Sequence, residues 1–278
     1  MKQAKEPRKG RSTRQMLSAS VLLVLLALVS ISAATLAWFT IADRTRVQSM
    51  GMDITTGSNL RFDLDAHSSF DAYVKTLSFE QIAARIRLDK GFDMQSKPLE
   101  PVTTDDCMTF TLENGTVVQS VSGAYLEFTL HFMAARDMIV HLSSADSGRS
   151  QDGTAVSSQT ASLPEAMRIS FTVGDRVMIY DPGMGGTSVQ SGNVRTFGLP
   201  AANNMVYNAD NELFGLEKLV DQPVLVHVWL EGTDPACTDT LRGTDYSIQL
   251  RFVGTDENGN VMDEAEREDQ TQQISSGS

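Results

Sequence analysis

Apolar and polar residues alternate with a period of two through most of the chain that follows residue 46. This pattern is typical of strands that bury one face, and the Asn-Gly dipeptide in Glu113–Thr116 favours a hairpin turn between two of them. About ten short strands of this kind predict an all-β fold, in which two sheets pack as a β-sandwich. The predicted strands are Val47–Ile54, Leu60–Leu64, Met108–Leu112, Val117–Val121, Tyr125–Met133, Ile139–Leu142, Met167–Val173, Arg176–Tyr180, Val224–Leu230 and Tyr246–Phe252.

Helical periodicity marks only a minor insert. Phe79–Arg87 repeats apolar side chains at helical spacing, and Ser78 with Gln81 forms a weak capping box before it. A second short helix near Leu213–Leu219 is doubtful because Gly215 interrupts it. Helix is therefore a small addition to a β fold.

Three segments lack a clear period. Asp181–Asn193 is rich in Gly and Ser and Ser143–Ser162 is small and polar, so we expect both to be loops. The tail from Gly254 carries seven acidic residues between Asp256 and Asp269 and is expected to be disordered.

A basic stretch and an apolar run precede the β region. Residues 1–15 carry six basic side chains and one acidic one, and residues 16–37 carry no charge. This is the order of a secretory signal, whose basic flank stays in the cytoplasm and sends the following chain outward. Small residues lead to a cleavage site between Ala37 and Trp38. The run from Met16 to Phe39 also approaches the roughly 20 residues that span a bilayer, so an uncleaved transmembrane helix is the alternative.

The predicted organisation therefore has three parts: a signal peptide or membrane anchor (1–37), a β-sandwich domain (38–253) and an acidic disordered tail (254–278). The formal net charge of the chain is −12, and the +5 of residues 1–15 leaves −17 on residues 38–278. A field of that sign repels phosphate backbones, so we expect no nucleic-acid partner.

Export also changes the interpretation of the two cysteines. Outside the cytoplasm, Cys107 and Cys237 are expected to form a disulfide, which would close a loop of about 130 residues. The alternative is a reactive thiol. Carboxylates stand beside both cysteines, Asp106 next to the first and Asp234 near the second, and they disfavour the thiolate.

Candidate catalytic residues are few. The histidines His67, His131, His141 and His227 lack the spacing of a zinc motif, and those within strands have the parity of solvated side chains. No nucleophile elbow and no local Ser-His-Asp signature is present. We therefore expect neither an enzyme activity nor a cofactor.

The segment Glu231–Pro235 has two interpretations. It forms a turn that proline ends, or Glu231 and Asp234 contribute to a cation or ligand site as weak metal candidates. Just before it, Trp229 has the opposite parity to its apolar neighbours. This tryptophan either covers a second apolar layer or anchors the surface.

Two segments resemble a known family. Ala34–Thr40, with Val47, Gly57 and Leu60–Leu64, resembles the start of the camelysin-like exported proteins of Gram-positive bacteria, which include the main fibre protein of the biofilm matrix. Val226–Cys237 is similar to a segment of uncharacterised members with this type of signal.

The resemblance implies a jelly-roll β-sandwich, cleavage at Ala37–Trp38 by a dedicated signal peptidase, a surface or matrix location and a capacity for self-assembly. Some members were described as metalloproteases, an activity for which this sequence offers no zinc motif.

The resulting hypothesis is a secreted or cell-surface structural protein. Its expected partners are the signal peptidase, copies of itself, matrix or cell-wall components, and the membrane through the N-terminal helix before or without cleavage. After cleavage, Trp38–Ile54 is a free segment that can pair with its own sheet or with a neighbour's. The alternative is a monomeric surface module that binds a glycan or Ca2+.

Overall fold

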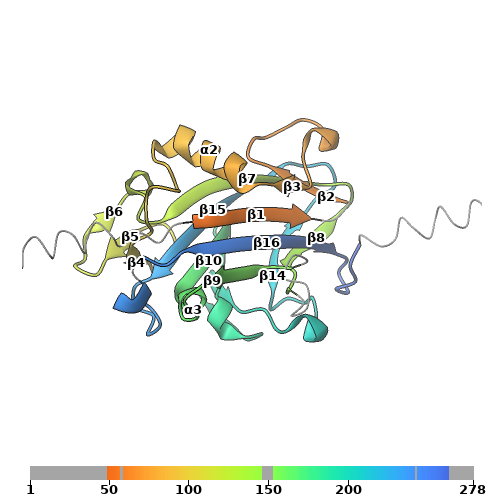
Figure 1. Cartoon of the computed structure of the whole chain (residues 1–278). Helices are drawn as coiled ribbons and strands as arrows, with labels where there is room; N and C mark the ends of the chain where they lie inside the picture. Colours follow the sequence, from red (N-terminus) through yellow and green to blue (C-terminus); the bar gives the residue numbers. More distant parts are fainter. Residues whose placement is uncertain (1–48, 57–58, 146–152, 242, 263–278) are drawn as a thin grey trace, which may run out of the picture. The chain divides into compact units, whose positions relative to one another are not determined.

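The computed structural model describes residues 49–56, 59–145, 153–241 and 243–262. Every described residue lies within Arg46–Ser278, one of the two units into which the chain divides. This part is mostly β, with two sheets and short helices, which confirms the expected all-β class (Figure 1). The expected cleavage site at Ala37 and Trp38 and the apolar run before it lie outside the described residues. None of the helices in the described ranges combines the length and the apolar character that a membrane span requires.

The smaller sheet has the strand order β14-β8-β16-β1-β3, and β9 also pairs with β16. Its first and last strands in the sequence, β1 and β16, run parallel to each other, whereas the other pairs are antiparallel. The strands are β1 (Ser49–Thr56), β3 (Thr76–Leu77), β8 (Met138–Leu142), β9 (Ala155–Ser158), β14 (Glu212–Leu216) and β16 (Tyr246–Thr255).

The larger sheet has the order β12-β13-β11-β10-β15-β4-β5-β6, with β7 paired to β15 and β2 paired to β7. Its long central strands are those that the alternation predicted. The strands are β2 (Leu60–Asp63), β4 (Pro101–Thr103), β5 (Phe110–Leu112), β6 (Val117–Val118), β7 (Leu126–Ala134), β10 (Met167–Val173), β11 (Arg176–Tyr180), β12 (Ser188–Ser191), β13 (Val194–Phe197) and β15 (Gln222–Glu231).

Helix α2 (Phe79–Lys90) confirms the predicted helical insert. The side chain of Gln81 accepts from the backbone N–H of Ser78 at 2.9 Å, and Gly91 ends the helix in the left-handed conformation that glycine adopts readily. The remaining helical elements are short. They are α3 (Leu163–Ala166) and the 3-10 turns η1 (Phe70–Ala72), η2 (Ser120–Ser122), η3 (Pro182–Met184), η4 (Ala202–Asn204) and η5 (Asp239–Leu241).

The two sheets pack against each other through an aromatic cluster centred on Phe252 of β16. Its ring lies 5.0 Å from that of Phe132, 5.6 Å from that of Phe171 and 6.1 Å from that of Phe62, all of which belong to the larger sheet. All three pairs meet edge to face, the arrangement that the aromatic quadrupole favours. The inward positions of β16 predicted from its alternation are therefore the core positions.

A second, smaller apolar cluster contains Trp229, which is 1% exposed. The tryptophan packs with Val102 of β4 and Phe110 of β5. Trp229 thus covers a second apolar layer, one of the two roles that its parity allowed.

The structure corrects several sequence-based boundaries. The expected loop Ser143–Ser162 contains β9 and the expected loop Asp181–Asn193 contains β12; each pairs with a single strand, so small polar residues suffice there. The doubtful expectation of a helix near Leu213–Leu219 is wrong, because this segment contains most of β14, which pairs with β8. The expectation of a disordered tail from residue 254 is also wrong in part. Strand β16 runs to Thr255 and residues up to 262 fold back on it, while 263–278 lie outside the described residues.

Replacing Phe252 with alanine is expected to lower the free energy of unfolding by about 3–5 kcal/mol, because the cavity would open where both sheets meet. Chemical denaturation of the variant and the parent measures the difference. Val189→Ala, at a position 60% exposed, is the control and should change stability by less than about 0.5 kcal/mol. Equal losses for the two variants would contradict the assignment of Phe252 to the centre of the core.

Candidate functional site

Strand β1 lies between β16 and β3 and is held mainly by β16 (Figure 1). On the other side, β3 pairs only with Ile54 and Thr55. Residues 57–59 connect β1 to β2 in the larger sheet, so the link that leaves the carboxyl end of β1 is three residues long. The parallel register with β16 runs from Ser49 opposite Tyr246 to Thr56 opposite Phe252.

A row of polar side chains crosses the larger sheet on the face opposite the main core. The register places Ser170 of β10 opposite His227 of β15, and His227 opposite Glu127 of β7. Glu127 accepts from Nε2 of His227 at 3.1 Å, and Nδ1 of that ring lies 3.4 Å from the Ser170 hydroxyl. The ammonium of Lys90, the last residue of α2, binds the other carboxylate oxygen of Glu127 and also Ser120. The row therefore connects α2 to three neighbouring strands.

This polar row has the residue types of a Ser-His-acid triad, but it is closed to a substrate. Ser170 is 0% exposed and His227 is 1% exposed. The His227 ring packs against Phe110 and Tyr125, with centroids 5.2 and 5.8 Å away. A nucleophilic serine needs an open position beside its hydroxyl for the reacting carbon. The row is thus a buried structural feature, and the expectation that His227 is solvated is wrong because β4–β6 add a second layer over it.

The charge state of the row follows from its hydrogen bonds. Bonds from His227 and Lys90 lower the pKa of Glu127 to about 2, against the ordinary value of 4.5, although burial acts in the opposite direction. Glu127 is therefore ionised at neutral pH and accepts from both partners. Because a carboxylate only accepts, Nε2 of His227 carries a proton.

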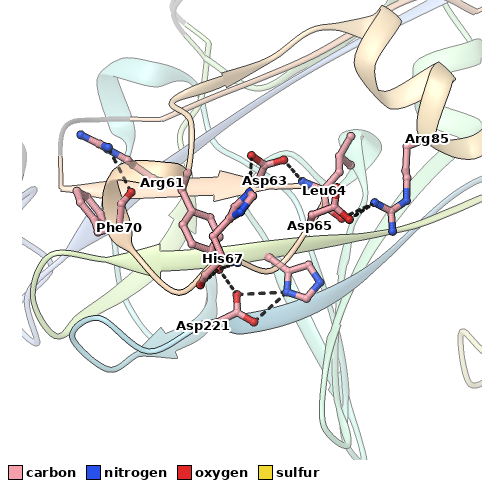
Figure 2. Close-up of polar contacts among 10 residues, drawn as sticks. Arg61, Asp63, Leu64, Asp65, His67, Phe70, Arg85 and Asp221 are labelled. Atoms are coloured by element: carbon pink, nitrogen blue, oxygen red, sulfur yellow. Dashed lines mark hydrogen bonds and ion pairs between the residues drawn. The ribbon is translucent and has the colours of Figure 1, made fainter.

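A second polar cluster fixes the segment that leads into β3 (Figure 2). The Tyr73 hydroxyl donates to Asp221 at 2.7 Å and accepts from the backbone N–H of His67 at 2.9 Å. Asp221 also accepts from Nδ1 of His131 at 2.9 Å, and Asp63 lies 3.1 Å from Nε2 of His67. Burial is the main cause that raises the pKa of Tyr73 to about 12, so its hydroxyl remains a donor.

Two arginines complete this cluster (Figure 2). Arg61 donates to the carbonyl of Phe70 at 3.2 Å and stacks over its ring, with 4.3 Å from the guanidinium carbon to the centroid. Arg85 of α2 donates to the carbonyl of Leu64 at 3.0 Å and pairs with Asp65 at 2.6 Å. The segment between β2 and β3 is thus bonded to both sheet and helix.

The weak metal candidates Glu231 and Asp234 are occupied by the protein's own donors. Glu231 accepts from Nε1 of Trp229 at 3.0 Å and from the hydroxyl of Thr233 at 2.6 Å, and Asp234 pairs with Arg168. These bonds build a turn, the first of the two interpretations of this segment. In the part of the chain that the structure describes, no group of three or more His, Cys, Asp or Glu side chains is arranged to hold a metal ion.

The other strand histidines are also bonded within the protein. His141 is 2% exposed; it bonds to the side chain of Asn211 at 2.8 Å and lies 3.2 Å from the Thr255 hydroxyl. Burial lowers the pKa of His141. His131 is only partly exposed and pairs with Asp221. The expectation that the strand histidines are solvated is thus wrong, because groups from neighbouring strands and loops cover these side chains.

The expected disulfide is absent from the structure. Cys107 and Cys237 are both free; Cys107 is buried in the smaller apolar cluster and Cys237 packs at the margin of the main core. The two thiols therefore belong to different apolar clusters. Burial raises the pKa of both, to about 12 for Cys107, which also disfavours the alternative of a reactive thiolate.

Comparison with known proteins adds no family assignment. No family model matches the sequence, and no curated protein matches it. A solved structure described as "AvmM Catalyzes Macrocyclization in Alchivemycin A Biosynthesis" is 10% identical, with a TM-score of 0.16 over 47% of this chain and 79% of that chain. A similarity this low supports no statement about the activity of this protein.

The free thiols lead to a direct prediction. Under denaturing conditions without reductant, alkylation is expected to label both Cys107 and Cys237, whereas in the native protein Cys107 should resist because it is 1% exposed. Peptide mapping by mass spectrometry reads the two labels. Recovery of a linked Cys107–Cys237 peptide pair from the purified protein would contradict the structure.

The lowered pKa of Glu127 predicts acid sensitivity. Because this carboxyl has a lower pKa in the folded state than when unfolded, its stabilisation is fully present above about pH 4.5 and is lost as the pH falls toward about 2. The loss should amount to about 3 kcal/mol at most, measured by urea unfolding at a series of pH values.

Glu127→Gln should be less stable than the parent at pH 7 and show a flatter profile between pH 4.5 and 2. Asp65→Asn is the control, since it removes a carboxylate whose side chain is 69% exposed. The assignment of this acid sensitivity to Glu127 fails if Glu127→Gln loses stability between pH 4.5 and 2 as steeply as the parent.

Proposed function

We propose that this protein is an exported structural protein of the cell surface or extracellular matrix, whose copies assemble by donating β1 to a neighbour. The observation that supports this function best is the attachment of β1. The strand pairs in parallel with β16 and is tethered through the short link to β2. A strand held in this way can be replaced by the same strand of another copy, because both satisfy the same backbone groups.

Donation of β1 makes a contact between two different surfaces, the strand of one copy and the β16 edge of the next. Such a head-to-tail contact propagates as a filament unless its rotation closes a ring. The β16 edge carries Phe252, so the incoming strand would complete the sheet beside the centre of the core. Assembly and correct folding would then depend on the same pairing.

The export signal belongs to the same proposal. Cleavage between Ala37 and Trp38 by a dedicated signal peptidase would free the segment that ends in β1, and retention of the apolar run would keep the protein as a membrane-anchored surface protein. Membership of the camelysin-like family, with jelly-roll connectivity of the strands, is likewise proposed on the resemblance of Ala34–Thr40 and Leu60–Leu64.

A second candidate function is a monomeric surface module that binds a glycan. The observation in its favour is a cavity of about 210 Å³ with a mostly polar lining. Amide, carboxylate and hydroxyl groups at the wall are suited to the hydroxyl groups of a sugar. The polar lining residues include Thr187, Ser188, Asn204, Asn208, Asp210 and Asn211.

A reversible staple tests strand donation. Asp53 and Gln249 are register partners in β1 and β16, so Asp53→Cys with Gln249→Cys should lock β1 in its own sheet when oxidised. Electron microscopy of the exported part starting at Trp38 is expected to show filaments from the parent, none from the oxidised staple, and filaments again after reduction.

The matched control staples β16 to β9 instead, through Ser247→Cys with Ser157→Cys, and leaves β1 free. This variant should form filaments when oxidised. Filaments from the oxidised β1 staple would rule out donation of this strand, and filaments from neither the parent nor any variant would favour the monomeric binding module.

A further inference from the structure

The outer edge of β1 is closed by a strand and a helix that follow each other in the chain. Strand β3 pairs with β1 at its carboxyl end, and the backbone N–H of Thr56 donates to the carbonyl of Lys75 at 3.1 Å. Directly afterwards, α2 begins and packs against both β1 and β7 (Figure 1). Covering a strand edge with a helix prevents unwanted pairing at that edge. We call β3 and α2 together, Thr76–Lys90, the lid.

The two ends of the lid are fastened differently. Its base is bonded through the cluster in Figure 2, where Tyr73 is 2% exposed and Asp221 joins it to His131 of β7. Its far end is held by the ion pair of Lys90 with Glu127, whose side chains are 20% and 23% exposed. Between these ends the lid packs through an apolar helix face. The buried residues of that face are Phe79, Ile82, Ala83 and Ile86.

We infer that the Lys90–Glu127 pair is a latch on this lid and sets how often β1 leaves β16. The inference rests on the strand donation proposed above, because β1 must leave its own sheet before a neighbour receives it. His227 contributes by keeping Glu127 ionised and oriented as an acceptor. When the latch is open, the base stays bonded through Tyr73 and Asp221. Helix α2 is then held by its apolar face and by the bonds of Arg85 to Leu64 and Asp65, and its last residue has lost its ion pair with β7.

The latch is tested in the full chain with Lys90→Met, which keeps an apolar stem but removes the charge. Arg87→Met is the matched control, since it also removes a cation from the last turn of α2, at a side chain that is 61% exposed and pairs with Asp93. Amide hydrogen exchange is measured in β1, β16 and, as the internal reference, β10. Lys90→Met should speed exchange in β1 and β16 about tenfold relative to β10, the size expected for losing one partly exposed charge-assisted bond.

Glu127→Gln removes the other partner of the ion pair, the one on β7. If Lys90→Met is poorly folded, this variant should show the same selective increase of amide exchange in β1 and β16. Equal exchange rates for the Lys90→Met and Arg87→Met variants in β1 and β16 would overturn the latch. Filament growth is recorded separately. A selective increase in exchange without filaments from any variant supports the latch and contradicts strand donation, whereas filaments with unchanged exchange support donation and contradict the latch.

Discussion

The edge-to-face packing of Phe252 against three phenylalanines of the larger sheet is the contact on which the architecture depends. Strand β16, which carries it, is positioned by β8 and β9 on one edge and by β1 on the other. Strand β16 thus relies on β1 for the backbone hydrogen bonds along one of its two edges. Removing β1 leaves the central strand of the core open along one edge, which is costly unless an equivalent strand replaces it.

The polar row on the other face of the larger sheet has a related role. Burying an imidazole, a hydroxyl and a carboxylate is unfavourable unless each finds a partner, and here Ser170, His227 and Glu127 satisfy one another across three strands. The row ends in Lys90, whose ammonium requires a carboxylate at one place on the sheet. This ion pair therefore adds a directional contact between the end of α2 and β7 to the packing of the apolar helix face.

Much of the fold could be predicted because its signals are local. The period-two alternation located β7, β10, β15 and β16, and the capping box located α2. In each case the residues that give the signal lie close together in the sequence. The edge strands β9 and β12 carry small polar residues and gave no such signal. For Leu213–Leu219 the sequence allows only a doubtful helix, because Gly215 interrupts it, and the pairing of β14 with β8 determines the strand conformation.

The candidate sites were harder to predict because they depend on which strands are neighbours. Outward parity was assigned correctly to His227 and Trp229, but parity does not reveal that β4, β5 and β6 cover that face. The same limit explains the disulfide. Export and an even number of cysteines favour a bridge, yet Cys107 and Cys237 belong to different apolar clusters. The partners Tyr73 and Asp221 are also distant in sequence, so only the folded chain brings them together.

The short link between β1 and β2 determines what would control the exchange of β1 between copies. A strand tethered by three residues is present at its own sheet at an effective concentration on the order of mM or more, and a neighbour's identical strand offers the same backbone bonds. Pairing alone therefore favours the closed monomer in dilute solution, and the proposed assembly would have to draw free energy from further contacts between copies. The pairing also joins residues about 200 positions apart, which form contacts late in folding. In the assembly proposed above, the departure of β1 would then be the step that the chain itself controls, through the lid that closes over this strand.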